Sequence, residues 1–166
     1  SSDAHKEMIY KQNLLTPDKV FITGLPRNDI FFNQTKKDIK NKFFHNFKNL
    51  DKKIILYAPT HKEDLISSFF PFSDLKINEI EKFLVKNNFN LYLRPHINDT
   101  NKNKLWKKYI KSLKSENIIS LSFNELEDIN SFLPIVDILI TDYSTIYTDA
   151  ILFEIPTIFI PYDYLD

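Results

Sequence analysis

The segment from Asp137 to Asp163 limits the fold more than any other part of the chain. A short apolar run over 137–141 ends in a cluster of Asp, Ser and Thr residues, and a helical pattern follows over 145–153. A second apolar run begins after Pro156. This order predicts a strand, a loop, a helix and a second strand. Ligands of open α/β sheets bind at the carboxyl ends of such strands, and a helix amino terminus suits phosphate.

Strand and helix patterns also alternate along the rest of the chain. Several of the expected strands are continuous apolar runs, as is typical of strands that are covered on both faces. The pattern predicts an α/β fold, a Rossmann-like parallel sheet flanked by helices. The expected strands are 20–23, 53–57, 89–93, 117–121, 137–141 and 157–160, and the expected helices are 3–13, 35–47, 77–87, 102–114, 125–136 and 145–153.

A turn-rich segment over 26–33 is the best candidate for a domain boundary. The piece before it holds one helix and one strand, which is too little to bury a core alone. We therefore expect 1–30 to be the end of a preceding domain plus a linker. Residues 31–166 would then form one Rossmann-like, nucleotide-donor-binding domain.

Composition excludes several classes of function. The 22 basic and 22 acidic residues cancel, so no net field attracts nucleic acid or an anionic membrane. There is no cysteine, no apolar run of the ~18 residues that a membrane span needs, and nothing resembling a signal peptide at the start. These features predict a cytoplasmic protein. The spacing of His, Asp and Glu shows no metal motif, and the single glycine excludes a glycine-rich phosphate loop, so we expect neither a metal nor a cofactor.

Three polar segments follow expected parallel strands, over 57–64, 93–96 and 141–145. Parallel strands end at one edge of a sheet, so these segments should project together. The shared edge would carry a cationic fork, an imidazole and several hydroxyls, which suit a diphosphate ligand and an acid–base histidine. The residues expected there are Thr60, His61, Lys62, Arg94, His96, Ser144 and Thr145.

Each candidate also has a structural interpretation. Arg94 could pair with Asp99 or Asp142 in an ion pair instead of binding phosphate. Ser144 and Thr145 could cap the following helix, with assistance from Asp142. The sequence alone leaves these alternatives open.

The acidic residue Asp149 has two interpretations as well. It lies four residues after Thr145 and so on the same face of the expected helix. Its carboxylate could accept hydrogen bonds from a ribose or another ligand hydroxyl, or it could be a solvated acid. His61 could also serve as an acid–base histidine, like His96, but it lies on a longer loop.

Five motifs in order resemble the CDP-glycerol glycerophosphotransferases, which are the polymerases and primases of teichoic acids with relatives in capsule synthesis. The motifs are Thr23-Gly-Leu-Pro-Arg-Asn-Asp29, Ile55-Leu-Tyr-Ala-Pro-Thr60, Leu93-Arg-Pro-His96, Asp137-Ile-Leu-Ile-Thr-Asp-Tyr-Ser-Thr145 and Pro156-Thr-Ile-Phe-Ile-Pro-Tyr-Asp163. The resemblance implies a GT-B architecture, in which two Rossmann-like domains face a cleft. This chain would be the donor-binding half, truncated at its carboxy end. Family catalysis involves a histidine of the other domain, so the chain alone is expected to be inactive.

The resemblance also implies a reaction. An acceptor hydroxyl on a growing polyol-phosphate polymer attacks the β-phosphorus of CDP-glycerol, and CMP leaves. By resemblance, His96 serves the phosphate that bears the transferred group, and Ser144 and Thr145 hold the diphosphate. Arg94 supports the site or binds phosphate, and Asp149 meets glycerol or ribose. Thr60, His61 and Asp142 complete the expected substrate-binding set.

The implied partners are a CDP-linked polyol donor and a lipid-linked polymer acceptor. Peripheral association with the inner face of the cell membrane would come from regions outside this chain. Two departures from the family pattern leave glycerol, ribitol and a sugar open as the transferred group. His61 stands where a bulky aromatic residue is usual, and Ser144-Thr145 replaces the commoner Ser-Ser.

Two other functions compete with this one. A GT-B glycosyltransferase or 2-epimerase that uses a UDP-sugar shares the fold, but would usually show a glycine-rich loop near the donor phosphates. A non-catalytic α/β nucleotide-binding module, such as a receiver-like domain, needs an acidic pocket at the end of its first strand. The segment Tyr57-Ala-Pro59 supplies no such acid.

Overall fold

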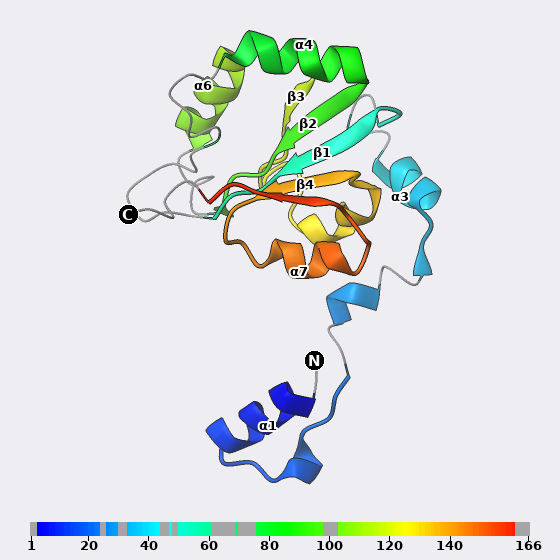
Figure 1. Cartoon of the computed structure of the whole chain (residues 1–166), viewed down its shortest axis with the longest axis vertical. Helices are drawn as coiled ribbons and strands as arrows, with labels where there is room; N and C mark the ends of the chain where they lie inside the picture. Colours follow the sequence, from blue (N-terminus) through cyan, green and yellow to red (C-terminus); the bar gives the residue numbers. More distant parts are fainter. Residues whose placement is uncertain are drawn as a thin grey trace. The chain divides into compact units, whose positions relative to one another are not determined.

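The computed structural model describes residues 3–23, 26–29, 33–43, 47, 50–60, 69, 76–97 and 103–161. The chain divides into two compact units, Ser1–Gln34 and Thr35–Asp166. The first unit holds helix α1 (Asp3–Gln12) and the 3-10 turns η1 (Pro17–Lys19) and η2 (Pro26–Asp29) (Figure 1). The strand predicted over 20–23 was wrong, since these residues join no sheet. The prediction that 1–30 belongs to a preceding domain remains a prediction.

The second unit is built on a five-stranded sheet in which every neighbouring pair is parallel. The strand order is β3-β2-β1-β4-β5, so the chain builds outward from β1 in one direction and then crosses back to start β4 on the other side. The predicted α/β parallel sheet is therefore confirmed. The strands are β1 (Lys53–Tyr57), β2 (Phe89–Leu93), β3 (Ile118–Ser120), β4 (Ile138–Thr141) and β5 (Thr157–Phe159).

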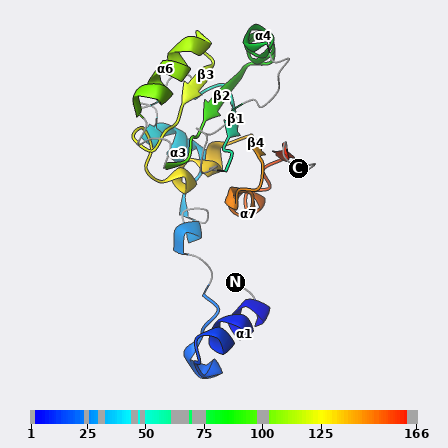
Figure 2. The same cartoon turned by 90° about the vertical axis from the view of Figure 1, so that its left-hand side faces the viewer.

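Helices cover both faces of this sheet (Figures 1 and 2). Side chains along β1 alternate between two apolar clusters, because successive residues of a strand point to opposite faces. Ile54 and Leu56 pack in the cluster that includes α3 (Lys36–Phe43), η3 (Ile129–Ser131), η4 (Leu133–Ile135) and α7 (Ile146–Ile151). Ile55 and Tyr57 pack in the cluster that includes α4 (Ile77–Asn87) and α6 (Asn103–Leu113). Burial on both faces explains why the strands read as solid apolar runs.

The helix predicted over 125–136 was wrong. The structure has two 3-10 turns there, η3 and η4. Pro134 lies inside the segment; it has no N–H to donate and disfavours helical backbone at the preceding residue. The apolar spacing that suggested a helix serves instead to bury Phe132, Leu133 and Ile135 in the core.

The start of α3 is set by local hydrogen bonds. Thr35 Oγ1 accepts from the Asp38 N–H at 3.2 Å, and Asp38 Oδ2 accepts from the Thr35 N–H at 3.1 Å. This reciprocal arrangement is a capping box, which satisfies donors that the first helical turn leaves unpaired. The Thr35 hydroxyl also donates to Asp38 Oδ2 at 2.6 Å, and this hydrogen bond, followed by the one from the Thr35 N–H, lowers the pKa of Asp38.

Candidate active site at the carboxyl edge of the sheet

The carboxyl ends of β1 and β4 lie side by side at the point where the strand order reverses. In open α/β sheets, this switch point is where ligands bind. Main-chain pairing continues past β1, since the Ala58 N–H donates to Ile140 O at 2.9 Å. The Thr141 hydroxyl also donates to Ala58 O, at 2.7 Å. Both strand ends therefore have fixed positions, and the segments that follow them start from a rigid base.

A direct contact between Thr60 and Asp142 bridges the switch point. The Thr60 N–H lies 2.8 Å from Asp142 Oδ1 and 3.0 Å from Oδ2, and the Thr60 hydroxyl donates to Oδ2 at 2.8 Å. The Tyr143 N–H donates to Oδ1 at 2.6 Å. Only 4% of Asp142 is exposed. We call this pair the Thr60–Asp142 clasp; it holds the loops after β1 and β4 together and balances a buried carboxylate with three donors.

Ser144 and Thr145 lie just beyond the clasp, immediately before α7. Ser144 Oγ accepts from the Ile146 N–H at 3.5 Å, a long and therefore weak capping bond. Thr145 occupies the N-cap position, is exposed, and makes no side-chain capping bond. The capping interpretation is thus weak for Ser144 and wrong for Thr145. Because α7 has only six residues, its amino terminus is a weak binding feature, and the hydroxyl groups of Ser144 and Thr145 are the stronger polar groups of this turn.

Asp149 lies inside α7 and is only 5% exposed, so the interpretation as a solvated acid was wrong. Its neighbour Ala150 is fully buried in the cluster beneath the sheet. The helix therefore turns this carboxylate away from bulk water, on the side that packs against the domain.

Arg94 follows β2 and points its guanidinium at the loop after β3. Nη1 donates to Leu121 O at 3.0 Å and to Leu126 O, and Nη2 donates to Glu127 O at 3.0 Å. Burial lowers the pKa of Arg94, while Asp128 and Glu125 act in the opposite direction. The carboxylate of Asp142 is held by Thr60 and Tyr143 instead of by this cation. The structure therefore describes a supporting role for Arg94, and a phosphate contact remains a prediction.

Replacing Arg94 with lysine should lower the free energy of unfolding of this unit by about 2 kcal/mol, because a single ammonium cannot reach all three carbonyls. Urea denaturation would measure the loss, and amide exchange should increase over 121–128. Lys108→Gln, which removes a cation from an exposed position of α6 in the same unit, is the control and should leave this stability unchanged. Equal effects of the two substitutions would contradict the supporting role.

His96 lies three residues after β2 and is exposed. It shares the carboxyl edge with Ser144, since β2, β1 and β4 are parallel neighbours. The predicted convergence of three loops on one edge is thus present in the strand order. His61 and Asp99 lie outside the described residues. The contact between Thr60 and Asp142 could not be predicted from the sequence, because two residues 82 positions apart carry no local signal.

Comparison with known proteins extends these observations. The chain is 31% identical over 151 residues to a teichoic acid poly(ribitol-phosphate) polymerase of Bacillus spizizenii, covering 88% of this chain and 23% of that protein. A teichoic acid poly(glycerol phosphate) polymerase of the same organism is 34% identical over 160 residues, covering 84% and 36%. The chain thus spans about a quarter to a third of the length of these relatives.

Solved structures give the same result. The wall teichoic acid polymerase TagF, which has a GT-B architecture, matches with a TM-score of 0.69 and 26% identity over 96% of this chain and 37% of that one. A histidine variant of TagF soaked with CDPG matches with a TM-score of 0.67 and 28% identity, covering 97% and 38%. The sheet described above is therefore the sheet of one half of a GT-B protein. The family model for CDP-glycerol:poly(glycerophosphate) glycerophosphotransferases matches residues 1–166, and the chain belongs to that family.

Proposed function

We propose that this protein transfers a polyol phosphate from a CDP-activated donor to a growing teichoic acid or capsule polymer and releases CMP. The observation that carries the proposal is the set of polar groups at the switch point of a sheet that matches a teichoic acid polymerase. One relative of this chain is named as a ribitol-phosphate polymerase and another as a glycerol phosphate polymerase. The chemistry they share is the polyol phosphate, and the polyol itself is decided by the test below.

The donor diphosphate would lie over the Thr60–Asp142 clasp. Because the clasp fixes both loops, the hydroxyls of Ser144 and Thr145 would be held in place before the ligand arrives. A preorganised site loses less conformational entropy on binding. The exposed hydroxyl of Thr145 is the group best able to donate to a phosphate oxygen. Asp142 would act by holding the loop, since three protein donors already occupy its carboxylate.

His96 would act on the phosphate that bears the transferred group. Phosphoryl transfer requires an aligned nucleophile and stabilisation of charge on the equatorial oxygens, so a hydrogen bond or proton from an imidazole is useful there. Arg94 would support the site through the loop after β3, and His61 would contribute from the loop after β1. Asp149 would contact a ribose or polyol hydroxyl only if the ligand reaches the inner side of α7, because the carboxylate is buried.

The acceptor in this proposal is the hydroxyl end of a lipid-linked polymer. Among the residues that the structure describes, no helix is long and apolar enough to cross a membrane. By the same proposal, the enzyme is cytoplasmic and meets its acceptor peripherally, at the inner face of the cell membrane, through regions beyond this chain.

A donor screen on the intact enzyme tests the function. CDP-glycerol, CDP-ribitol and a UDP-sugar would be compared for nucleotide release in the presence of acceptor. We expect CMP release from one CDP-polyol at a rate at least tenfold above UMP or UDP release from the UDP-sugar. A preference for the UDP-sugar would contradict the proposal and favour a glycosyltransferase.

A variant pair tests the donor site itself. Removing both hydroxyls, with Ser144→Ala and Thr145→Ala, should weaken CDP-polyol binding by about tenfold, the effect of losing charge-assisted hydrogen bonds. Thr148→Ala removes a hydroxyl from the same helix that donates to Thr145 O at 2.7 Å, and should have little effect. Calorimetry on the intact enzyme would measure both. Equal losses in the two variants would contradict a specific role for the turn.

A further inference from the structure

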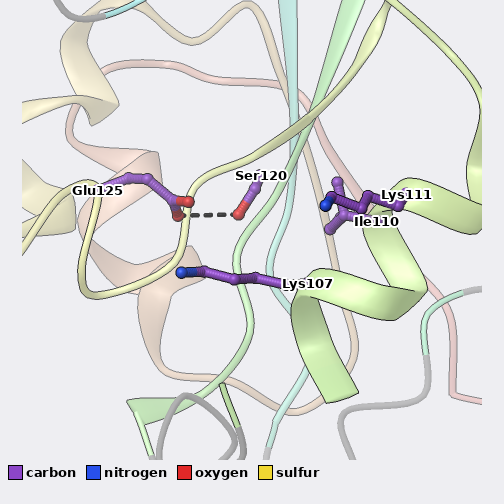
Figure 3. A pocket seen from close by; sticks show the side chains of 5 residues that line it. All are labelled: Lys107, Ile110, Lys111, Ser120 and Glu125. Carbon is purple, nitrogen blue, oxygen red and sulfur yellow. Dashed lines mark hydrogen bonds between the residues drawn. The ribbon is translucent and has the colours of Figure 1, made fainter. Parts of the chain in front are cut away.

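A hollow outside the switch point lies between α6 and the loop that follows β3 (Figure 3). Ser120 is the last residue of β3, so the hollow opens at the same carboxyl edge as the Thr60–Asp142 clasp. Because β2 lies between β3 and β1, two strand spacings separate the hollow from β1, a distance of roughly 10 Å along the edge. Its lining residues are Lys107, Ile110, Lys111, Ser120 and Glu125.

The loop wall of this hollow presents a fixed carboxylate. Glu125 Oε2 accepts from Ser120 Oγ at 2.8 Å, from the Ser122 N–H at 2.6 Å and from Ser122 Oγ. Among the described residues, Glu125 Oε1 accepts no hydrogen bond. Arg94 holds the next two carbonyls, Leu126 O and Glu127 O. The loop is thus anchored on both sides of Glu125, and one carboxylate oxygen is left to accept from a ligand.

The helix wall presents two cations. Lys107 and Lys111 are four residues apart and so lie on one face of α6, and Figure 3 shows both side chains reaching from the helix toward the hollow. Neither ammonium has an ion-pair partner within the part of the chain that the structure describes. The chain as a whole is neutral, so this local pair of positive charges is a feature of the hollow and not of the protein's net charge.

We propose that this hollow binds one polyol-phosphate unit of the polymer acceptor, an inference that rests on the proposed function. The ammonium groups of Lys107 and Lys111 bind the phosphate oxygens, and Glu125 Oε1 accepts a hydrogen bond from a polyol hydroxyl. Ile110 packs against the carbon chain of the polyol. The carboxylate of Glu125 adds selectivity, because two lysines alone would bind any anion. A fixed carboxylate repels an anion that brings no hydroxyl donor, so the set of groups selects a phosphate ester of a polyol.

The position of the hollow fits an acceptor unit better than the donor. The donor diphosphate belongs at the switch point between β1 and β4, whereas the hollow lies beside β3, at the edge of the sheet. A polymer of several units can reach along this edge while its hydroxyl end lies near His96. The hollow would then raise the affinity for chains that already carry several phosphates.

Binding of a defined oligomer to the full chain tests this inference. The probe is a synthetic tri(glycerol phosphate) without nucleotide, and CDP-glycerol is measured in parallel. Replacing Lys107 and Lys111 together with glutamine should weaken oligomer binding by about tenfold or more and change CDP-glycerol binding by less than twofold. Lys108→Gln is the matched control: it removes the same charge from the neighbouring exposed position of α6, which does not line the hollow, and should have little effect.

Glu125→Gln separates a polyol-phosphate site from a simple anion site. It should weaken binding of the oligomer severalfold but strengthen or leave unchanged the binding of sulfate, an anion that has no hydroxyl to donate at neutral pH. No binding of the oligomer to the unmodified chain, or equal losses in the Lys108 and the double-lysine variants, would overturn the inference. So would a loss of CDP-glycerol binding as large as the loss of oligomer binding, because the hollow would then belong to the donor. If the oligomer did not bind but CDP-glycerol bound normally, this inference would be wrong and the proposed function would stand.

Discussion

Replacing His96 with alanine should lower the rate of polyol-phosphate transfer by at least ~100-fold, the usual scale for loss of a general acid or base. His96 is exposed at the carboxyl edge, three residues after β2, where it can meet a ligand without rearrangement of the core. The rate constant should fall more than the affinity for the donor, because in the proposed function the imidazole would serve the reacting phosphate and the hydroxyls after β4 would bind the donor. Single-turnover CMP release by the intact enzyme would measure the effect.

A control substitution for His96 is available in the same chain. His5 lies on α1 in the first unit and is exposed, and His5→Ala should leave the transfer rate within a factor of two. Near-normal turnover of the His96 variant would remove this residue from the mechanism. A variant that lost donor affinity but kept its rate constant would make His96 a binding residue only.

Replacing Asp142 with alanine should cost about 3 kcal/mol of stability and abolish tight donor binding. The carboxylate is buried and accepts from the Thr60 N–H, the Thr60 hydroxyl and the Tyr143 N–H, so its removal leaves these donors without their partner. Each unsatisfied buried donor costs about 1–3 kcal/mol, although not additively. The loops after β1 and β4 would also separate at the switch point. Urea denaturation and calorimetry with a CDP-polyol would measure the two losses.

Asp137 provides the matched control for Asp142, because it makes a similar link at the opposite end of the same two strands. Asp137 Oδ2 accepts from the Ile54 N–H at 2.8 Å, just before β4 begins. Asp137→Ala should therefore reduce stability by about 1–2 kcal/mol and leave donor affinity unchanged in the folded protein. If both variants lost donor affinity in proportion to their stability, the Thr60–Asp142 clasp would have no specific part in the site.

The strands of the sheet could be predicted because burial on both faces leaves a strong pattern. The runs 54–57 and 91–93 are apolar and buried at successive positions, as is typical of a strand that is covered on both faces. The gathering of His96 and Ser144 at one edge followed from the same inference, since parallel strands all end on one side. The strand predicted over 20–23 was wrong because its apolar residues pair with no strand in the part of the chain that the structure describes. The helix predicted over 125–136 was wrong because the spacing of its apolar residues reflects burial in the core and not helical periodicity.

The roles of individual polar groups could not be predicted in the same way. The sequence shows that Arg94 stands where lysine is the common cation, but its partners are backbone carbonyls, which every residue has. In the sequence, nothing distinguishes Glu125 from the other acidic residues. Only the fold places two serines and two lysines around it. Such pairings depend on which loops the strand order brings together.

By itself, the sequence determined the class of fold, the edge of the sheet where polar groups gather and the family, because local patterns of apolar and polar residues record burial and strand direction. Only the tertiary structure decided that Thr60 meets Asp142, that Arg94 supports a loop, and that a fixed carboxylate faces two lysines across a hollow. The physical reason is the range of the interactions. Burial of an element leaves a pattern of apolar residues that can be read within a short stretch of sequence. A hydrogen bond between distant loops exists only after the sheet has been assembled.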